Sequence, residues 1–423
     1  MSDSRIPGFY RLTPSQRHSL LREKFGLSDE DITVLLGNSG LDLERATLMV
    51  ENCVGVFGLP IGLGLNFVIN DKPYIIPMVV EEPSIIAAVS NSAKAAGVLG
   101  GFTADADGGH MIAQVQLVEV QDIDSAEQAI MNARLQLLAL ANSKNPGMVK
   151  RGGGALELEV RTFETEPDML VVHLIVDCVD AMGANAVNTM AEGIAPLLET
   201  LTGARACLRI LSNLADRRCA RARCQVPVEA LKTAEMSGEA VAQGIVDAYR
   251  FAHVDPYRAA THNKGIMNGI DAVAIATGND WRSVEAGAHA YAARDGQYRS
   301  LTRWFVKDKV LHGSIELPMA VGVVGGSTGV HPTISVLRKL LNVRSASELG
   351  MVMACTGLAQ NLGALRALAS EGIQRGHMTL HARQAALAAG VDSEHVAAVA
   401  SALIANGDIR TEAARMLWQA MKR

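Results

Sequence analysis

The alternation of apolar and polar positions predicts helices at the start of the chain, followed by a hairpin. Residues 13–48 have a helical period, with capping side chains at Thr13 and Ser28. Strand-like runs follow at 65–69 and 74–80, and the short Asn-Asp-Lys segment between them predicts a tight turn. A helix of small residues is expected directly after the second run.

The middle of the chain predicts a separate small domain, because its strands and helices follow one another in a clear order. Strand, helix, strand, strand, helix, strand is the split order of ferredoxin-like domains. Pro196 lies inside the second helix and is expected to disturb it. The six stretches are 111–120, 125–142, 155–163, 169–177, 185–201 and 205–212.

These patterns together predict the α+β class. We expect a large discontinuous, mainly helical domain with a β segment at 315–328, an inserted small ferredoxin-like domain, and a C-terminal helical flap. A chain of 423 residues is too long for one ordinary core, which supports such a division. The expected bounds are 1–108 and 217–371 for the large domain, 109–216 for the small domain and 372–423 for the flap.

Composition and charge exclude several classes of protein. Apolar residues make up 49% and charged residues 20%, and the net charge of -5 gives no indication of a nucleic-acid surface. No apolar run approaches the roughly 18 to 20 residues of a membrane span, and no signal peptide is evident, so we expect a cytoplasmic protein without membrane segments. Six cysteines without a C-x-x-C pair predict reduced thiols.

Two glycine-rich turns are candidates for binding a phosphate or a nicotinamide. D-A-M-G-A-N (180–185) lies where a strand meets a helix, with Gly183 free to turn and Asn185 placed to cap the helix. G-V-V-G-G-S-T (322–328) follows an apolar strand. Neither is a G-x-G-x-x-G or P-loop sequence, which disfavours a Rossmann site and triphosphate hydrolysis. Spacing alone leaves open that both are plain turns.

A few charged residues stand out from their surroundings. Lys264 lies among small, uncharged residues in R-A-A-T-H-N-K-G-I-M-N-G, without a local acidic partner. Glu82 ends an apolar strand, where a carboxyl group serves as a proton donor or is simply a solvated charge. Asp280 reads as a helix N-cap. His377 and His381 lie one helical turn apart, but no third ligand is suggested, so no metal is expected.

These stretches together resemble one family, the hydroxymethylglutaryl-coenzyme A reductases, in its soluble, bacterial-type class II. The resemblance extends over nearly the whole chain, from S-R-I-P-G-F (4–9) onward. The stretches that carry it are E-E-P-S-I-I-A-A (81–88), D-A-M-G-A-N (180–185), T-H-N-K-G-I-M-N-G (261–269), A-T-G-N-D-W-R (276–282), G-V-V-G-G-S-T (322–328) and A-L-A-S-E-G-I-Q-R-G-H-M-T-L (367–380).

The resemblance implies a two-step, NAD(P)H-dependent reduction of hydroxymethylglutaryl-CoA to mevalonate and CoA through mevaldehyde, or the reverse reaction. In that chemistry Lys264 polarises the carbonyl, and Asp280 orients the lysine. Glu82 gives or takes a proton at the mevaldehyde stage, and His377 protonates the departing CoA thiolate. We therefore expect Lys264 to lie within contact distance of Asp280.

The resemblance also implies sets of binding residues. NAD(H) is slightly favoured as the cofactor and NADP(H) is the alternative, since Asn145 stands where a related sequence has Asp and basic residues lie nearby. The expected substrate contacts are Ser84, Arg258, Asn268, Asn213, Asn361 and Arg11. The expected cofactor contacts are Asn145, Asp180, Met182, Gly183, Asn185, Gly325 and Gly326.

The resemblance implies a homodimer with its active site at the subunit interface, and it leaves room for a trimer of dimers. Three features depart from the family pattern. Tyr10 replaces an Arg next to Arg11, Ser327 replaces Ala or Gly, and the loop 104–110 is more acidic than the family pattern leads us to expect. Two other functions stay open, a CoA-thioester lyase and a small-molecule sensor, but the sensor would leave Lys264 unexplained.

Overall fold

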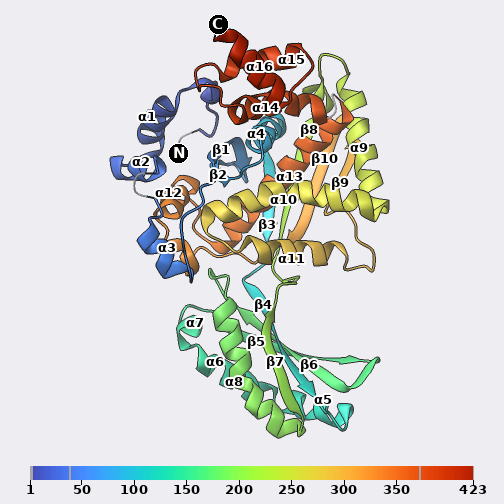
Figure 1. The fold of residues 1–423 in the computed structure, drawn as a ribbon. Helices are drawn as coiled ribbons and strands as arrows, with labels where there is room; N and C mark the ends of the chain where they lie inside the picture. Colours follow the sequence, from blue (N-terminus) through green and yellow to red (C-terminus); the bar gives the residue numbers. More distant parts are fainter. Residues whose placement is uncertain (1–2, 38–39, 371–372, 423) are drawn as a thin grey trace.

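Two β-sheets organise the fold (Figure 1). The computed structural model describes residues 3–37, 40–370 and 373–422, and the side chains of 327–328 and 373–380 lie outside that description. The six-stranded sheet has the order β2-β1-β3-β8-β10-β9, in which only β1 and β3 pair in parallel. Its strands are β1 (Ile61–Ile69), β2 (Lys72–Val79), β3 (Phe102–Ala106), β8 (Cys219–Pro227), β9 (Thr302–Lys307) and β10 (Val310–Pro318).

Helices of small residues pack against the six-stranded sheet. Helix α13 is buried along nearly its whole length, and α10 lies directly on it. A Cβ atom at Gly269 would lie 2.9 Å from Gln360 Cβ, so glycine allows this close approach and fixes the position of α10. The helices are α4 (Ile85–Ala96), α9 (Gly238–Val254), α10 (Pro256–Thr277), α11 (Trp281–Ala292), α12 (Pro332–Leu341) and α13 (Ala346–Ala369).

The four-stranded antiparallel sheet forms the lower part of the molecule in Figure 1, and the predicted ferredoxin-like order of elements is confirmed there. The predicted helix over 125–142 divides at Ala133. Pro196 does not interrupt α8, because the buried face of that helix, with Ile194 and Leu198, holds it against the sheet. The elements are β4 (His110–Val118), α5 (Ile123–Asn132), α6 (Arg134–Lys144), α7 (Pro146–Lys150), β5 (Gly154–Phe163), β6 (Glu166–Asp177), α8 (Ala184–Thr202) and β7 (Arg205–Ser212).

Sequence patterns missed three strands of the large sheet, β3, β8 and β9, and the predicted β segment 315–328 is strand only to Pro318. Strand β8 alternates small residues with arginines, a pattern that lacks an obvious apolar face. Arg221 on this strand is stabilised by carboxylates from other segments, and these partners are not visible in the local sequence. The rest of the predicted segment turns because it is rich in glycine.

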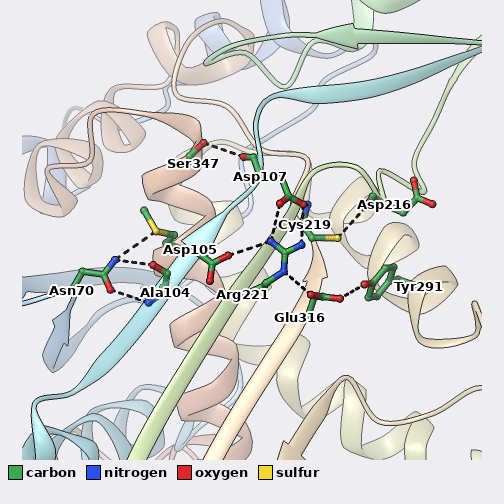
Figure 2. Close-up of polar contacts among 11 residues, drawn as sticks. Asn70, Ala104, Asp105, Asp107, Asp216, Cys219, Arg221, Tyr291, Glu316 and Ser347 are labelled. Atoms are coloured by element: carbon green, nitrogen blue, oxygen red, sulfur yellow. Dashed lines mark hydrogen bonds and ion pairs between the residues drawn. The ribbon is translucent and has the colours of Figure 1, made fainter. Parts of the chain in front are cut away.

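The acidic loop 104–110 now has a structural explanation (Figure 2). Arg221 on β8 donates to Asp107 at 2.8 Å and to Asp105 at 3.2 Å. It also donates to Glu316 on β10 at 2.6 Å, and Tyr291 donates to the same carboxylate. The chain passes from the large sheet to the small one through this loop, the outgoing crossing, and it returns to the large sheet at β8. These ion pairs therefore connect the outgoing crossing to the strand on which the chain returns.

Both ends of the chain are helical, as predicted. The C-terminal helices lie at the end of the large part opposite the small sheet, and the N-terminal helices lie along one side of the large part (Figure 1). The predicted caps Thr13 and Ser28 both form capping boxes. The N-terminal helices are α1 (Pro14–Phe25), α2 (Asp29–Leu35) and α3 (Leu43–Met49). The C-terminal helices α14 (Ile373–Ala388), α15 (Val396–Ala405) and α16 (Thr411–Met421) share a small core of their own. Short 3₁₀ turns occur at Phe9–Arg11, Gly97–Leu99, Val228–Leu231 and Gly326–Gly329.

The apolar cores follow the two sheets, with one large cluster under the six-stranded sheet and another in the four-stranded part. The exact domain bounds stay a prediction. All six cysteines are free in the structure. Within the described ranges, no helix combines the length and apolar character needed to cross a bilayer.

Candidate active site

The centre of the candidate site is an ion pair between α10 and the segment that follows β2. Lys264 Nζ donates to Glu82 Oε2 at 2.8 Å. Asn268, one turn along α10, donates its side-chain amide to the same oxygen at 3.2 Å. The Lys264 side chain is 60% exposed and that of Glu82 36%, so a ligand can reach both groups. Three residues predicted to act together are therefore adjacent.

A buried polar network fixes α10 beneath this pair. Asn361 Oδ1 accepts from Trp304 Nε1 at 2.8 Å and from Thr302 Oγ1 at 3.0 Å. The Asn361 amide lies 3.1 Å from His262 Nε2, two residues before Lys264. Burial lowers the pKa of His262 to about 3, so its imidazole is neutral. Asn361 was predicted to contact substrate, but here it is 1% exposed and part of the support for α10.

The predicted contact between Lys264 and Asp280 is wrong within this chain. Asp280 is the N-cap of α11, and its Oδ1 accepts from the backbone amides of Arg282 at 3.1 Å and Ser283 at 3.2 Å. Its nearest cation is Arg282, at 3.6 Å. Among the described residues, the ion pair of Lys264 is with Glu82. The reading of Asp280 as a cap is therefore confirmed, and its catalytic role stays a prediction.

Sequence reasoning missed a chain of acid and base groups between α10 and α11. Asp271 and Glu285 lie against each other, and burial together with the Glu285 contact raises the pKa of Asp271. His289 Nε2 is 2.6 Å from Glu285 Oε2, and His289 Nδ1 is 2.6 Å from the Tyr298 hydroxyl. The charge of Lys264 also acts on Glu285. Glu285 and His289 lie one turn apart on α11, but no local sequence signal joins Asp271 to Glu285, which face one another because α10 and α11 pack together.

The other four predicted substrate residues each lie in a different setting. Ser84 has a left-handed backbone with φ of 73°, which is strained for a residue with a side chain and occurs often at functional sites. Arg258 is half-buried in the first turn of α10, and no carboxylate among the described residues pairs with it. Asn213 Oδ1 accepts from Ser283 Oγ at 2.9 Å, next to Asp280. Arg11 is exposed and stacks on Tyr10.

The two glycine-rich turns, predicted separately, meet in the structure. Val323 donates its backbone amide to the Asp180 carbonyl at 2.9 Å, and Ala181 forms a β-bridge with Val324. The amide of Gly322 donates to Asn279 Oδ1 at 2.8 Å, one residue before Asp280. Backbone contacts and one side-chain hydrogen bond therefore connect three segments: the turn from the small sheet, the turn from the large sheet and the segment that carries Asp280.

Backbone strain and close packing mark the first of these turns. Gly183 is the N-cap of α8 with φ of 94°, and a Cβ atom there would lie 2.2 Å from Cys178 Sγ. Val179 is left-handed with φ of 53°, which is rare for a β-branched residue. The prediction that Asn185 caps α8 is wrong, because the chain enters the helix two residues earlier, at Gly183. Asn185 is exposed in the first turn.

The remaining predicted cofactor residues are placed as follows. Asp180 Oδ1 accepts from the Ala346 amide at 2.9 Å, and Met182 is half-buried against the small core. Gly325 and Gly326 have left-handed φ values of 79° and 63°. Asn145 caps α7 through Met148. His377 belongs to α14, but its side chain lies outside the described residues, as does that of Ser327.

Comparison with known proteins identifies the family. The profile described as hydroxymethylglutaryl-coenzyme A reductase matches residues 13–382. The 3-hydroxy-3-methylglutaryl-coenzyme A reductase of Archaeoglobus fulgidus is 48% identical over 421 residues, covering 99% of this chain and 95% of the relative. The chain belongs to the hydroxymethylglutaryl-coenzyme A reductase family. It is thus an oxidoreductase of that family, which the residues in the six stretches had indicated.

Solved members of the reductase family share the fold over most of the chain. The 3-hydroxy-3-methylglutaryl-coenzyme A reductase from Streptococcus pneumoniae superimposes with a TM-score of 0.84 at 42% identity, covering 98% of this chain and 99% of that one. A structure of the class II enzyme from the same organism, bound to NADPH in open conformations, gives 0.83 at 43% identity, covering 86% and 99%. The class II assignment and the mixed helix and sheet fold are both confirmed.

Proposed function

We propose that the chain reduces hydroxymethylglutaryl-CoA to mevalonate and free CoA in two hydride transfers, with mevaldehyde between them. The observation that carries the proposal is the exposed Lys264–Glu82 ion pair, with Asn268 on the same carboxylate oxygen. Family membership supports it. A lyase or a sensor would not need an ammonium, a carboxyl group and an amide at one accessible point beside two joined glycine turns.

Charge development explains why the reaction needs these groups. Each hydride adds to a carbonyl carbon and leaves negative charge on its oxygen, which the Lys264 ammonium stabilises. Glu82 supplies the proton when mevaldehyde is reduced to the alcohol. The CoA thiolate that leaves after the first hydride takes a proton, for which we propose His377 on α14. Two cofactor molecules are oxidised, and two protons are taken up.

We propose that the joined glycine turns bind the nicotinamide dinucleotide. The solved class II relative bound to NADPH supports a cofactor of this kind. Left-handed glycines at 325 and 326, and the tight turn at Gly183, let backbone amides approach a phosphate. The choice between NADH and NADPH depends on Asn145 and its exposed basic neighbours. The ratio of kcat/KM for the two cofactors measures it.

We also propose that the active site is completed in a homodimer. Lys264 and Asp280 are not paired within one chain, so the expected partner carboxylate is the partner subunit's Asp280. An apolar surface supports such an interface, since Leu48 is 83%, Val54 97% and Phe57 88% exposed. Side chains of this kind are unfavourable in water and are typically covered by a partner.

The proposal is tested by following nicotinamide absorbance with hydroxymethylglutaryl-CoA, and with mevalonate and CoA in the other direction. Wild-type protein is expected to turn over with at least one cofactor. Lys264→Ala is expected to lower kcat by about 100-fold or more, because it removes the charge that stabilises the oxyanion. Its thermal unfolding should stay unchanged, since the side chain is largely exposed.

Lys94→Ala is the matched control, an exposed lysine on α4 that is away from the ion pair. It should retain wild-type activity. Absence of any absorbance change with either cofactor in both directions would refute the proposed function. Full activity in Lys264→Ala would remove this lysine from the mechanism but leave the reaction itself in place.

A further inference from the structure

Arg218 is a buried arginine that binds backbone and no carboxylate. Its residue is 4% exposed, and no ion pair joins it to an acidic side chain in the described part of the chain. Its guanidinium donates through Nη1 to the Ala181 carbonyl at 3.0 Å and through Nη2 to the Val321 carbonyl at 2.6 Å. A longer bond of 3.4 Å reaches the Met182 carbonyl. The charges of Asp177 and Asp180 act on it from a distance, but neither carboxylate bonds to it, so this buried guanidinium depends on backbone carbonyls to use its donors.

The carbonyls that Arg218 binds belong to two different parts of the fold. Ala181 and Met182 are in the turn between β6 and α8 of the small sheet, whereas Val321 starts the glycine-rich turn after β10 of the large sheet. The other hydrogen bond and the β-bridge that join the two turns, among their described residues, involve backbone atoms. A Cβ atom at Gly322 would lie 2.5 Å from the Met182 amide nitrogen, so the contact leaves no room for a side chain. The planar guanidinium of Arg218 therefore donates hydrogen bonds to both turns at once.

Arg218 is itself anchored at the crossing between the sheets. It precedes β8, and its carbonyl accepts from the Met319 amide at 2.8 Å, just after β10. Its neighbour Cys219 donates its amide to Asp107 Oδ2 at 3.0 Å in the outgoing crossing. Figure 2 shows that crossing beside β8. The hydrogen bonds of the guanidinium therefore fix the position of the small-sheet turn relative to the large sheet.

We propose that Arg218 is a positioning residue for hydride transfer, which holds the two glycine-rich turns in the one relative position that binds the dinucleotide and presents it to the substrate. This inference rests on the proposed function of the turns. Because the amide of Gly322 binds Asn279, a shift of the second turn also displaces the segment that carries Asp280. Arg218 thus acts on the cofactor and on the catalytic carboxylate through backbone, without touching either.

The test compares Arg218→Lys and Arg218→Met with Arg221→Met. Lysine keeps the charge but lacks the fork, so it can bind one turn and not both. Arg221 is the matched control, an arginine on β8 whose partners are carboxylates of the crossing and of β10, and not the turns. The measurements are thermal unfolding, fluorescence titration with NADH and NADPH, steady-state kinetics for both substrates, and the isotope effect with C4-deuterated cofactor.

Arg218→Lys is expected to stay folded and to keep its KM for hydroxymethylglutaryl-CoA. It should bind reduced cofactor about tenfold more weakly, because the loss of one charged hydrogen bond has an effect of that size. The deuterium isotope effect on kcat should rise, because hydride transfer becomes slower. Arg218→Met should show the larger effect. Arg221→Met should lower the unfolding temperature while cofactor affinity and isotope effect stay at wild-type values.

Wild-type cofactor affinity and isotope effect in Arg218→Lys, with reduced stability alone, would overturn the inference. A parallel rise in the KM of both substrates would also overturn it, since that indicates general damage to the fold. The fluorescence titration separates this result from failure of the proposed function. It measures binding to the turns even if the wild-type protein reduces no hydroxymethylglutaryl-CoA.

Discussion

At the scale of single residues, the candidate site depends on which charges are paired and which are shielded. Lys264 and Glu82 form an exposed pair, which contributes little to folding and stays available to a ligand. Asp271 is different, because it lies against Glu285 with one carboxylate oxygen buried and without a hydrogen-bond partner. Two carboxyl groups in contact favour sharing one proton over carrying two charges. Asp271 is therefore the protonated member at neutral pH.

This protonation predicts a pH dependence of stability. Burial and Glu285 raise the pKa of Asp271 to about 9, so the folded chain holds a proton that the unfolded chain releases near the ordinary Asp value. Stability from this group is full below the unfolded pKa and is lost as pH rises through the folded one. Asp271→Asn keeps a donor toward Glu285 but cannot ionise, so it removes the dependence.

Between about pH 7 and pH 9, wild-type protein should lose about 2–4 °C more in unfolding temperature than Asp271→Asn, measured by calorimetry. Asp247→Asn is the control, an exposed aspartate on α9, and should follow the wild type. Parallel curves for wild type and Asp271→Asn would contradict a shared proton. The lowered pKa of Glu285, caused first by its hydrogen bond to His289, acts below this window and does not disturb it.

At the scale of elements, α8 shows how a turn is specialised for close approach. The helix has a left-handed glycine at each end, Gly183 with φ of 94° and Gly203 with φ of 69°. Around Gly203 there is open space, whereas a Cβ atom at Gly183 would meet Cys178 at 2.2 Å. The first glycine is thus required by both conformation and packing, and the second by conformation alone.

Gly203→Ala is expected to destabilise the protein by about 1 kcal/mol, the strain of a left-handed alanine. Gly183→Ala carries the same strain and adds an overlap with Cys178 of about 1–3 kcal/mol, because the turn must move. Urea unfolding measures both values. Gly183→Ala should also weaken NAD(P)H binding in a fluorescence titration, while Gly203→Ala should not. Equal effects of the two variants on cofactor binding would contradict the proposal that the Gly183 turn belongs to the cofactor site.

At the scale of the whole molecule, the residues expected to act together in catalysis do not all meet within one chain. Lys264 and Glu82 lie on the large part, and Asp280 caps α11 at the joined glycine turns. The exposed apolar segment around Val54 and Phe57 offers a surface for a second copy. A homodimer in which each subunit supplies Asp280 to the other would reconcile the separation with the expected role of that carboxylate.

Complementation between subunits tests this arrangement. Lys264→Ala and Asp280→Ala should each be nearly inactive as homodimers. A mixed dimer of the two variants contains one site with both residues intact if the sites are shared between subunits, and none if each site lies within one chain. Activity near half of the wild-type value per mixed dimer, measured after co-expression and tandem-tag purification, is expected. An inactive mixed dimer, or a monomer by light scattering, would contradict the shared site.

The amino-acid sequence by itself determined much of the local structure. The capping boxes at Thr13 and Ser28, the order of strands and helices along the small domain and the helix start at Asp280 depend on hydrogen bonds and apolar periods within a few residues. The motifs that carry the family resemblance are likewise local, which is why the candidate residues were named before the fold. The failed cap at Asn185 shows the limit, because Gly183 competed for the same turn.

Only the tertiary structure decided which of these groups meet. Lys264 pairs with Glu82 and not with Asp280, Arg218 spans two turns, and the acidic loop is held by Arg221, all through residues far apart in sequence. Strand β8 was missed for the same reason, since Arg221 is stabilised by carboxylates of other segments. Short-range periodicity fixes elements, but a long-range pair depends on how those elements pack, and packing is not encoded in any one stretch.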